Sequence, residues 1–155
     1  KMTAPGYQGI TADRIPQIAL PDGVGYVRII AGSYGSVKGP ARTFTPMNMW
    51  DLRVQRGHRV ALDLPEGQTT ALFVLSGAIS LDEGHSVHSA ELALMERKGS
   101  RVEFMAPENT TVLLLSGEPI DEPIVGHGPF VMNTHEEIAQ AINDYNNGRF
   151  GQISH

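Results

Sequence analysis

Short runs in which hydrophobic and polar positions alternate follow one another along most of this chain, and turn residues separate the runs. This pattern predicts strands at seven places, namely residues 25–31, 48–54, 58–64, 69–75, 90–95, 101–105 and 110–115. Regularly spaced short strands are typical of a β-sandwich or barrel. The chain is therefore expected to fold as an all-β domain.

The alternation within the strands predicts which side chains enter the core. Side chains two residues apart in a strand point to the same face, so an apolar set with polar neighbours indicates one buried face. Residues 71–75 and 112–115 are apolar without alternation, which predicts strands that are covered on both faces. The alternating positions predicted to line the core are Val60, Leu62, Leu64, Leu92, Leu94, Val102 and Phe104.

The last third of the chain changes to helical spacing. Thr134 followed by Glu137 is a capping-box pattern, in which each residue bonds the free backbone N–H of the other. Gly148 suits the left-handed position after a helix. The sequence therefore predicts one amphipathic C-terminal helix, whose apolar stripe should cover another surface through Ile138, Ile142 and Tyr145.

Proline-rich segments precede and follow the predicted barrel. Pro119 and Pro123 cannot donate to a sheet, so residues 118–123 are expected to form a stiff, extended arm. Residues 1–23 contain three prolines and no sustained periodicity, which predicts a linker on the surface.

Composition removes several classes of function. The 155 residues include no cysteine, which excludes a disulfide framework, a thiolate metal site and a cysteine nucleophile. The net charge of −5 argues against direct binding to nucleic acid. We see neither a secretory leader nor an apolar run long enough for a membrane span. A cytoplasmic protein is expected.

One long, irregular motif carries a family resemblance. HGPFVMNT at residues 127–134 is followed by EEI at 136–138 and QAI at 140–142, and LLSGEPI at 114–120 precedes it. Together these segments resemble the C-terminal signature of the pirin family. The similarity continues upstream through residues 2–8, 15–16, 22–23, 31–32, 39–40 and 43–46, so it covers nearly the whole chain.

The resemblance implies a cupin fold, which is a double-stranded β-helix or jelly-roll barrel, with one C-terminal α-helix. Pirins resemble two cupin barrels in one chain, the first of which holds a metal through three histidines and a glutamate. This sequence corresponds to the second barrel, and we expect it to be a C-terminal piece of a longer protein. The implied plan is a linker over residues 1–23 from a missing N-terminal cupin, a cupin barrel over 24–117, and an arm with a helix over 118–155.

The cupin ligand positions are not occupied by metal-binding residues in this sequence. If Gly77 closes the first cupin motif, the carboxylate position falls on Thr70 and the histidine positions fall near residues 64–66. The histidine of the second motif corresponds to Val102. We therefore expect neither a metal nor a catalytic residue in this chain. The resemblance implies iron or another divalent metal in the N-terminal half.

The histidines leave two alternatives open. His85 and His88 are spaced by three in a turn and could bind an adventitious metal, or they could belong to a solvated loop. His127 lies between two glycines, which allow close approach to another surface. We expect it to be a structural histidine at a domain interface. The candidate contacts with the other barrel are His127, Pro129, Phe130 and Met132.

Other motifs support no further chemistry. Asp121 and Glu122 are adjacent on an extended arm and point to opposite sides, so they cannot easily share a substrate. The glycine pairs at 23–25 and 126–128 lack the last glycine of a dinucleotide loop, and no Gly-x-Ser-x-Gly occurs. The basic cluster is either a solvated hairpin tip or a contact for an acidic protein, and it comprises Arg53, Arg56, His58 and Arg59.

Three functions are compatible with these observations. The favoured hypothesis is a metal-free structural and interaction half, whose partner is the N-terminal cupin of the same protein and which could form a homodimer by itself. The second hypothesis is an enzyme, since some pirins resemble quercetin 2,3-dioxygenases, although that activity would belong to the missing half. The third is a redox-linked transcriptional co-regulator or protein-binding module, which the bacterial character of residues 119–123 and 148–151 disfavours.

Overall fold

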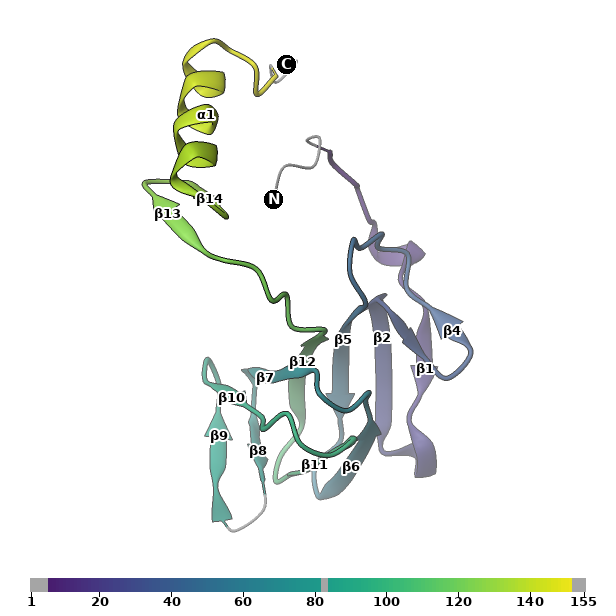
Figure 1. Cartoon of the computed structure of the whole chain (residues 1–155). Coiled ribbons are helices and arrows are strands. Elements are labelled where there is room, and N and C mark those ends of the chain that lie inside the picture. The colour runs from purple at the N-terminus through teal and green to yellow at the C-terminus, as the bar shows by residue number, and fades with distance from the viewer. Residues whose placement is uncertain (1–5, 82–83, 152–155) are drawn as a thin grey trace. The chain divides into compact units, whose positions relative to one another are not determined.

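A computed structural model describes residues 6–81 and 84–151 of the chain (Figure 1). The chain divides into two compact units. The barrel unit is Gly9–Pro119. The second, which we call the hairpin–helix unit, contains the described residues from Ile120 onward together with those before Gly9.

The barrel unit is built from two antiparallel sheets and a small hairpin. The six-stranded sheet has the order β1 (Gln17–Ala19), β2 (Gly25–Ala31), β5 (Met47–Val54), β12 (Thr110–Gly117), β7 (Thr69–Ser76) and β10 (Leu92–Leu94). The four-stranded sheet has the order β6 (His58–Asp63), β11 (Arg101–Ala106), β8 (Ala78–Ser80) and β9 (Ser86–His88). The hairpin joins β3 (Ser33–Tyr34) to β4 (Val37–Lys38). Short 3₁₀ turns lie at Ala12–Arg14 and Pro21–Gly23.

The hydrophobic core is formed by the inward faces of both sheets. In the six-stranded sheet, Leu114 on β12 stands between Trp50 on β5 and Leu72 on β7. In the four-stranded sheet, Phe104 on β11 pairs with Val60 on β6. All five side chains are buried in one cluster. The inward positions predicted at Val60, Leu62, Leu64, Val102 and Phe104 are confirmed.

The prediction for Leu92 and Leu94 is wrong. These side chains are 54% and 70% exposed, and Ala93 between them packs against the core. Strand β10 is the edge of the six-stranded sheet, and its register places Leu92 opposite Phe73 on the outer face. Alternation identified the two faces of this strand correctly, but the tertiary register decided which of them turned inward.

The outer face of the six-stranded sheet is also less covered than the apolar runs indicated. Leu72 and Val74 point into the core, whereas Phe73 and Leu113 are half-buried and Leu75 is exposed. Phe73 and Leu113 are register partners, so they share this outer face. Within the described residues, β7 and β12 are therefore fully covered on one face only.

The structure also differs from the expected surface linker at residues 1–23. Gln17–Ala19 form β1, which pairs with β2, and Leu20 is buried in the core. The barrel unit thus begins at Gly9 rather than at residue 24. A strand of three residues is too short to display a periodic pattern, and the same limitation hid β8 and β9. The sequence Asp82-Glu83-Gly84 also predicts a tight turn, and the first two of these residues lie outside the described part of the chain.

The hairpin–helix unit consists of β13 (Val125–His127), β14 (Phe130–Met132) and helix α1 (His135–Asn146). The predicted capping box is confirmed, since Glu137 N donates to Thr134 Oγ1 at 3.1 Å and Thr134 N donates to Glu137 Oε2 at 3.2 Å. Gly148 has the expected left-handed conformation, with φ +69°. No helix among the described residues is long and apolar enough to cross a membrane.

Candidate functional site

One end of the barrel is lined by a connected polar network. Asn48 on β5 and Ser116 on β12 are register partners, and Asn48 Nδ2 donates to Ser116 Oγ at 3.2 Å. Ser116 Oγ in turn donates to Gln68 Oε1 at 2.7 Å. The backbone N–H of Ser33 donates to Asn48 Oδ1 at 3.2 Å. The network therefore links the β3–β4 hairpin to three strand ends of the barrel.

The positions that align with cupin metal ligands lie together beside this network. Leu64, Thr70 and Val102 all line one small cavity of about 180 Å³. All three residues are buried. Residues from β7, from β11 and from just after β6 therefore converge at this cavity.

These residues do not fit a metal ion. Leu64 and Val102 offer no donor atom, and a single Thr70 hydroxyl cannot supply the nitrogen and carboxylate ligands that hold iron. Across residues 6–81 and 84–151, no group of three or more histidine, aspartate or glutamate side chains is arranged to hold a metal. No metal-dependent step can be derived from the residues of this cavity.

A larger, open cavity of about 740 Å³ adjoins the small one, and Pro65 and Gln68 line both. Its walls come from the β3–β4 hairpin with the segment that follows it, from the start of β5, and from the end of β6. The charged side chains on these walls are Lys38, Arg42 and Asp63. The cavity has the volume of a small-molecule site.

The cavity is lined by one aromatic residue, Trp50, on which a second, Tyr34, packs. Trp50 lines it and is only 2% exposed, and its Nε1 atom has no hydrogen-bond partner in the part of the chain that the structure describes. Tyr34 packs edge-on against the Trp50 ring, with the ring centroids 5.3 Å apart. Burial raises the pKa of the Tyr34 phenol, and the charge of the Asp63 carboxylate adds to this effect.

The residues predicted as interdomain contacts all lie on the hairpin–helix unit. His127 ends β13, and Phe130 and Met132 are the first and last residues of β14. His127 and Pro129 are exposed, whereas Phe130 and Met132 are half-buried within the unit. The structure thus brings the four residues into one two-stranded hairpin, in which His127 pairs with Phe130.

An aromatic cluster joins this hairpin to the end of the helix. The ring centroids of Phe130, Tyr145 and Phe150 lie between 6.1 and 6.2 Å from one another. The helix buries Ile138 and Ala141, while Ile142 is half-buried. Tyr145 contacts the rings of Phe130 and Phe150 but remains 64% exposed, so it covers little apolar surface. Apolar surface is therefore left open on this unit.

The histidine pair is not an enclosed site. His88 belongs to strand β9 rather than to a turn, where it pairs with Ala78, and both His85 and His88 are exposed. Strand β9 could not be predicted from the sequence, because three residues are too few to show an alternating pattern.

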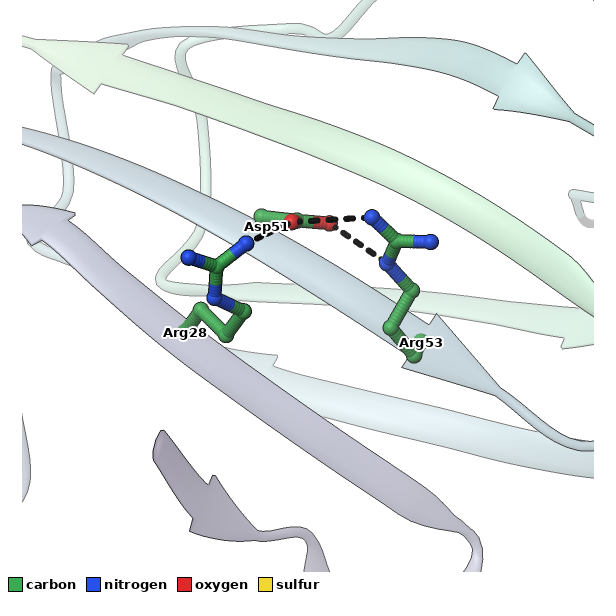
Figure 2. A network of polar contacts seen from close by, with 3 residues as sticks. All are labelled: Arg28, Asp51 and Arg53. Carbon is green, nitrogen blue, oxygen red and sulfur yellow. Dashed lines mark hydrogen bonds and ion pairs between the residues drawn. The ribbon is translucent and has the colours of Figure 1, made fainter. Parts of the chain in front are cut away.

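Two arginines of the predicted basic cluster, Arg53 and Arg59, pair with carboxylates. Figure 2 shows Asp51 between Arg28 and Arg53, all on the outer face of the six-stranded sheet. Arg59 lies 3.9 Å from Glu103 across β6 and β11. These ion pairs favour the solvated-surface interpretation over a site for an acidic partner.

Sequence reasoning missed the residues of the larger cavity. Lys38, Arg42, Asn48 and Trp50 are spread over thirteen residues and belong to no motif that we recognised. The available signal was the combination of one tryptophan, the only one in the chain, with a preceding segment rich in glycine and proline. Neither signal predicts a cavity without the fold.

Comparison with known proteins identifies the relatives of this chain. A family model of the pirin C-terminal cupin domain matches residues 49–151. A candidate quercetin 2,3-dioxygenase of Pseudomonas aeruginosa is 47% identical over 150 residues, which make up 97% of this chain and 52% of that protein. Pirin of Mus musculus is 35% identical over 155 residues, covering 97% of this chain and 53% of that protein.

The fold has close counterparts among solved structures. The crystal structure of a quercetin 2,3-dioxygenase from Acinetobacter baumannii matches with a TM-score of 0.91 and 45% identity, over 99% of this chain and 54% of that one. The predicted mostly-β cupin fold with one helix is confirmed. The chain spans about half the length of the curated relatives that it matches.

Proposed function

The chain belongs to the pirin family, and we propose that it acts as the metal-free C-terminal barrel of a pirin-like protein, supporting an N-terminal cupin that binds iron. One observation carries this proposal. Thr70, Val102 and, from the segment 64–66, Leu64 and Pro65 line one cavity but provide only aliphatic groups and a single hydroxyl. The remaining residue of that segment, Glu66, is not among the lining residues, and its carboxylate accepts from the N–H of Gly99. The role of the barrel is then structural and interactive rather than catalytic.

The names of the relatives suggest an oxygenase reaction for the whole protein. Proteins named for quercetin 2,3-dioxygenase activity are 45–47% identical to this chain. We infer that the whole protein oxidises a flavonol-like substrate with oxygen at a metal in its N-terminal barrel. Oxygen chemistry of this kind needs a redox metal with open coordination positions, which the residues of this chain do not hold.

The hairpin–helix unit supports the interaction role. Val131 is 51% exposed, and Ile124, Tyr145 and Phe150 are also exposed apolar residues of the same unit. Exposed apolar surface of this kind marks sites of protein contact. In our proposal the hairpin that carries His127, Pro129, Phe130 and Met132 contacts the N-terminal barrel.

Metal loading and turnover test the metal-free assignment. The purified chain is incubated with Fe²⁺ under anaerobic conditions, desalted and analysed for iron, and oxygen uptake is then recorded with quercetin. We expect far less than one iron per chain and no oxygen uptake above the rate of the buffer. Stoichiometric iron together with quercetin loss in the chain alone would refute the proposal.

A reconstitution experiment tests the interaction role. An N-terminal cupin half, taken from the parent sequence and made separately, is titrated with this chain by calorimetry. We expect saturable binding that Val131→Asp weakens by about tenfold or more. Ala139→Asp adds the same charge at an exposed position of the helix and should leave binding unchanged. Equal effects of the two variants, or no binding by the unmodified chain, would exclude this hairpin as the contact.

A further inference from the structure

We propose that the 740 Å³ cavity at the end of the barrel binds a small planar anion, specifically an aromatic carboxylate. The inference does not depend on a metal in this chain or in any other part of the protein. It rests on the construction of the cavity wall, on the charges that face it, and on a buried donor without a partner.

The wall formed by the β3–β4 hairpin is held in place by close backbone packing. A Cβ atom added to Gly39 would lie 2.6 Å from the backbone of Ile30, and one added to Gly32 would lie 2.4 Å from the carbonyl oxygen of Met47. The N–H of Gly39 donates to the carbonyl of Gly32 at 2.9 Å, and the N–H of Ala41 donates to that of Ile30 at 3.0 Å. The cavity is therefore preformed, which lowers the entropic cost of binding a rigid ligand.

The charges facing the cavity favour an anion. Lys38 and Arg42 place two positive charges on the wall formed by the hairpin and the segment after it, whereas Asp63 supplies one negative charge at the end of β6. A carboxylate can accept hydrogen bonds from both an ammonium and a guanidinium group. A ligand carboxylate held near Lys38 and Arg42 would keep its negative charge paired, and the rest of the ligand would point toward the interior of the cavity.

The uncharged part of the lining favours a flat apolar body. Trp50 and Met47 contribute apolar surface, and three prolines at positions 40, 46 and 65 add rigid, non-donating faces. Rings of a planar ligand pack well on such surfaces. Uncharged polar side chains, among them Asn48 and Gln68, line the same cavity, so an aromatic ring that carries a carboxylate and a hydroxyl would contact both kinds of surface.

The indole of Trp50 supplies the remaining recognition element. Its Nε1–H is buried and finds no acceptor in the described part of the chain. A ligand oxygen that reaches this N–H would supply the acceptor that the donor otherwise lacks, and this would favour the bound state. A hydroxyl group on the ring, opposite the carboxylate, would place an acceptor at the inner end of the ligand.

The test uses 4-hydroxybenzoate as the probe and ¹⁵N-labelled chain for NMR. Because the chain has one tryptophan, its spectrum contains a single indole N–H signal, which reports directly on this cavity. We expect saturable shifts of that signal and of the Gly32 and Gly39 amides, with a Kd of about 1 mM or lower. The uncharged methyl ester of the probe should bind about tenfold more weakly.

Charge variants separate the site from the general surface. Lys38→Met combined with Arg42→Gln should weaken binding by about tenfold or more, whereas Asp63→Asn should strengthen it. Arg56→Gln removes one positive charge at the turn between β5 and β6, outside the cavity lining, and serves as the control with unchanged affinity. A thermal melt establishes that each variant is folded. Lack of saturation of the indole shift, equal binding of the ester, or equal loss in Arg56→Gln would overturn the proposal.

Discussion

Arg53 and Asp51 form a two-bond ion pair on one face of β5, with Arg53 Nε 3.0 Å from Asp51 Oδ1 and Arg53 Nη2 3.2 Å from Asp51 Oδ2. Arg28 on the neighbouring strand β2 adds a contact of 3.4 Å to Asp51 Oδ2 (Figure 2). The bond to Asp51 raises the pKa of the Arg53 guanidinium, since it favours the charged form. The buried Asp51 carboxylate thus joins β5 to β2 through Arg28, and it also pairs with Arg53 on its own strand.

Replacement of Asp51 should destabilise the barrel. Asp51→Asn keeps the size of the side chain but removes the charge that both arginines share, and we expect the free energy of unfolding to fall by about 1–2 kcal/mol. Urea denaturation measures this loss. Glu103→Gln is the matched control, because Glu103 also pairs with arginines but is more exposed, and its effect should stay below about 0.5 kcal/mol. Equal losses of unfolding free energy in the two variants would show that Asp51 stabilises the barrel no more than Glu103 does.

The capping box should hold the first turn of α1. Thr134→Ala removes the acceptor of the Glu137 N–H and should cost the helix about 1 kcal/mol. Amide hydrogen exchange in residues 136–140 is the appropriate measurement, since it reports on the helix rather than on the barrel. Thr134→Ser retains the hydroxyl and should exchange nearly as slowly as the unmodified chain. Faster exchange of equal size in both variants would show that the hydroxyl is not the stabilising group.

Tyr34 should make the barrel sensitive to alkaline pH. Burial raises the pKa of Tyr34 in the folded state above its value in the unfolded chain, so the phenol favours folding while it stays protonated. This contribution is complete below the unfolded pKa of about 10 and is lost as the pH rises through the folded pKa. Tyr34→Phe should therefore lose less stability than the unmodified chain above that pH. Thermal melts at matched pH values test this, and parallel pH profiles would contradict it.

The exposed apolar surface of the hairpin–helix unit should cause self-association. If this surface normally contacts another barrel, the chain by itself should form dimers as its concentration rises, and it should bind a hydrophobic dye. Light scattering over a wide concentration range measures the mass. Val131→Asp should shift the equilibrium toward monomer, whereas Ala139→Asp should not. A chain that stays monomeric at all concentrations and binds no dye would show that this surface does not require contact with another protein surface.

The sequence by itself determined most of the long elements. Strand β2 has the predicted bounds, and β5, β6, β7, β11 and β12 differ from their predicted ranges by only a few terminal residues. The helix cap at Thr134 and the left-handed Gly148 were also predicted, because capping depends on side chains only three residues apart. The metal-ligand positions at Thr70 and Val102 came from the resemblance, and the fold places both at one cavity. Strand bounds and helix caps could be predicted because they depend on residues that are close together in the sequence.

Tertiary structure alone decided the rest. Leu92 and Leu94 face outward because the pairing of β10 with β7 turns Ala93 toward the core, and a strand pattern cannot state which face will meet the other sheet. The three-residue strands β1 and β8 pair with the longer strands β2 and β11, and β9 pairs in turn with β8. The larger cavity brings Lys38, Trp50 and Asp63 together from separate strands. Such a site depends on register and on sheet packing, which arise only when residues distant in sequence come into contact.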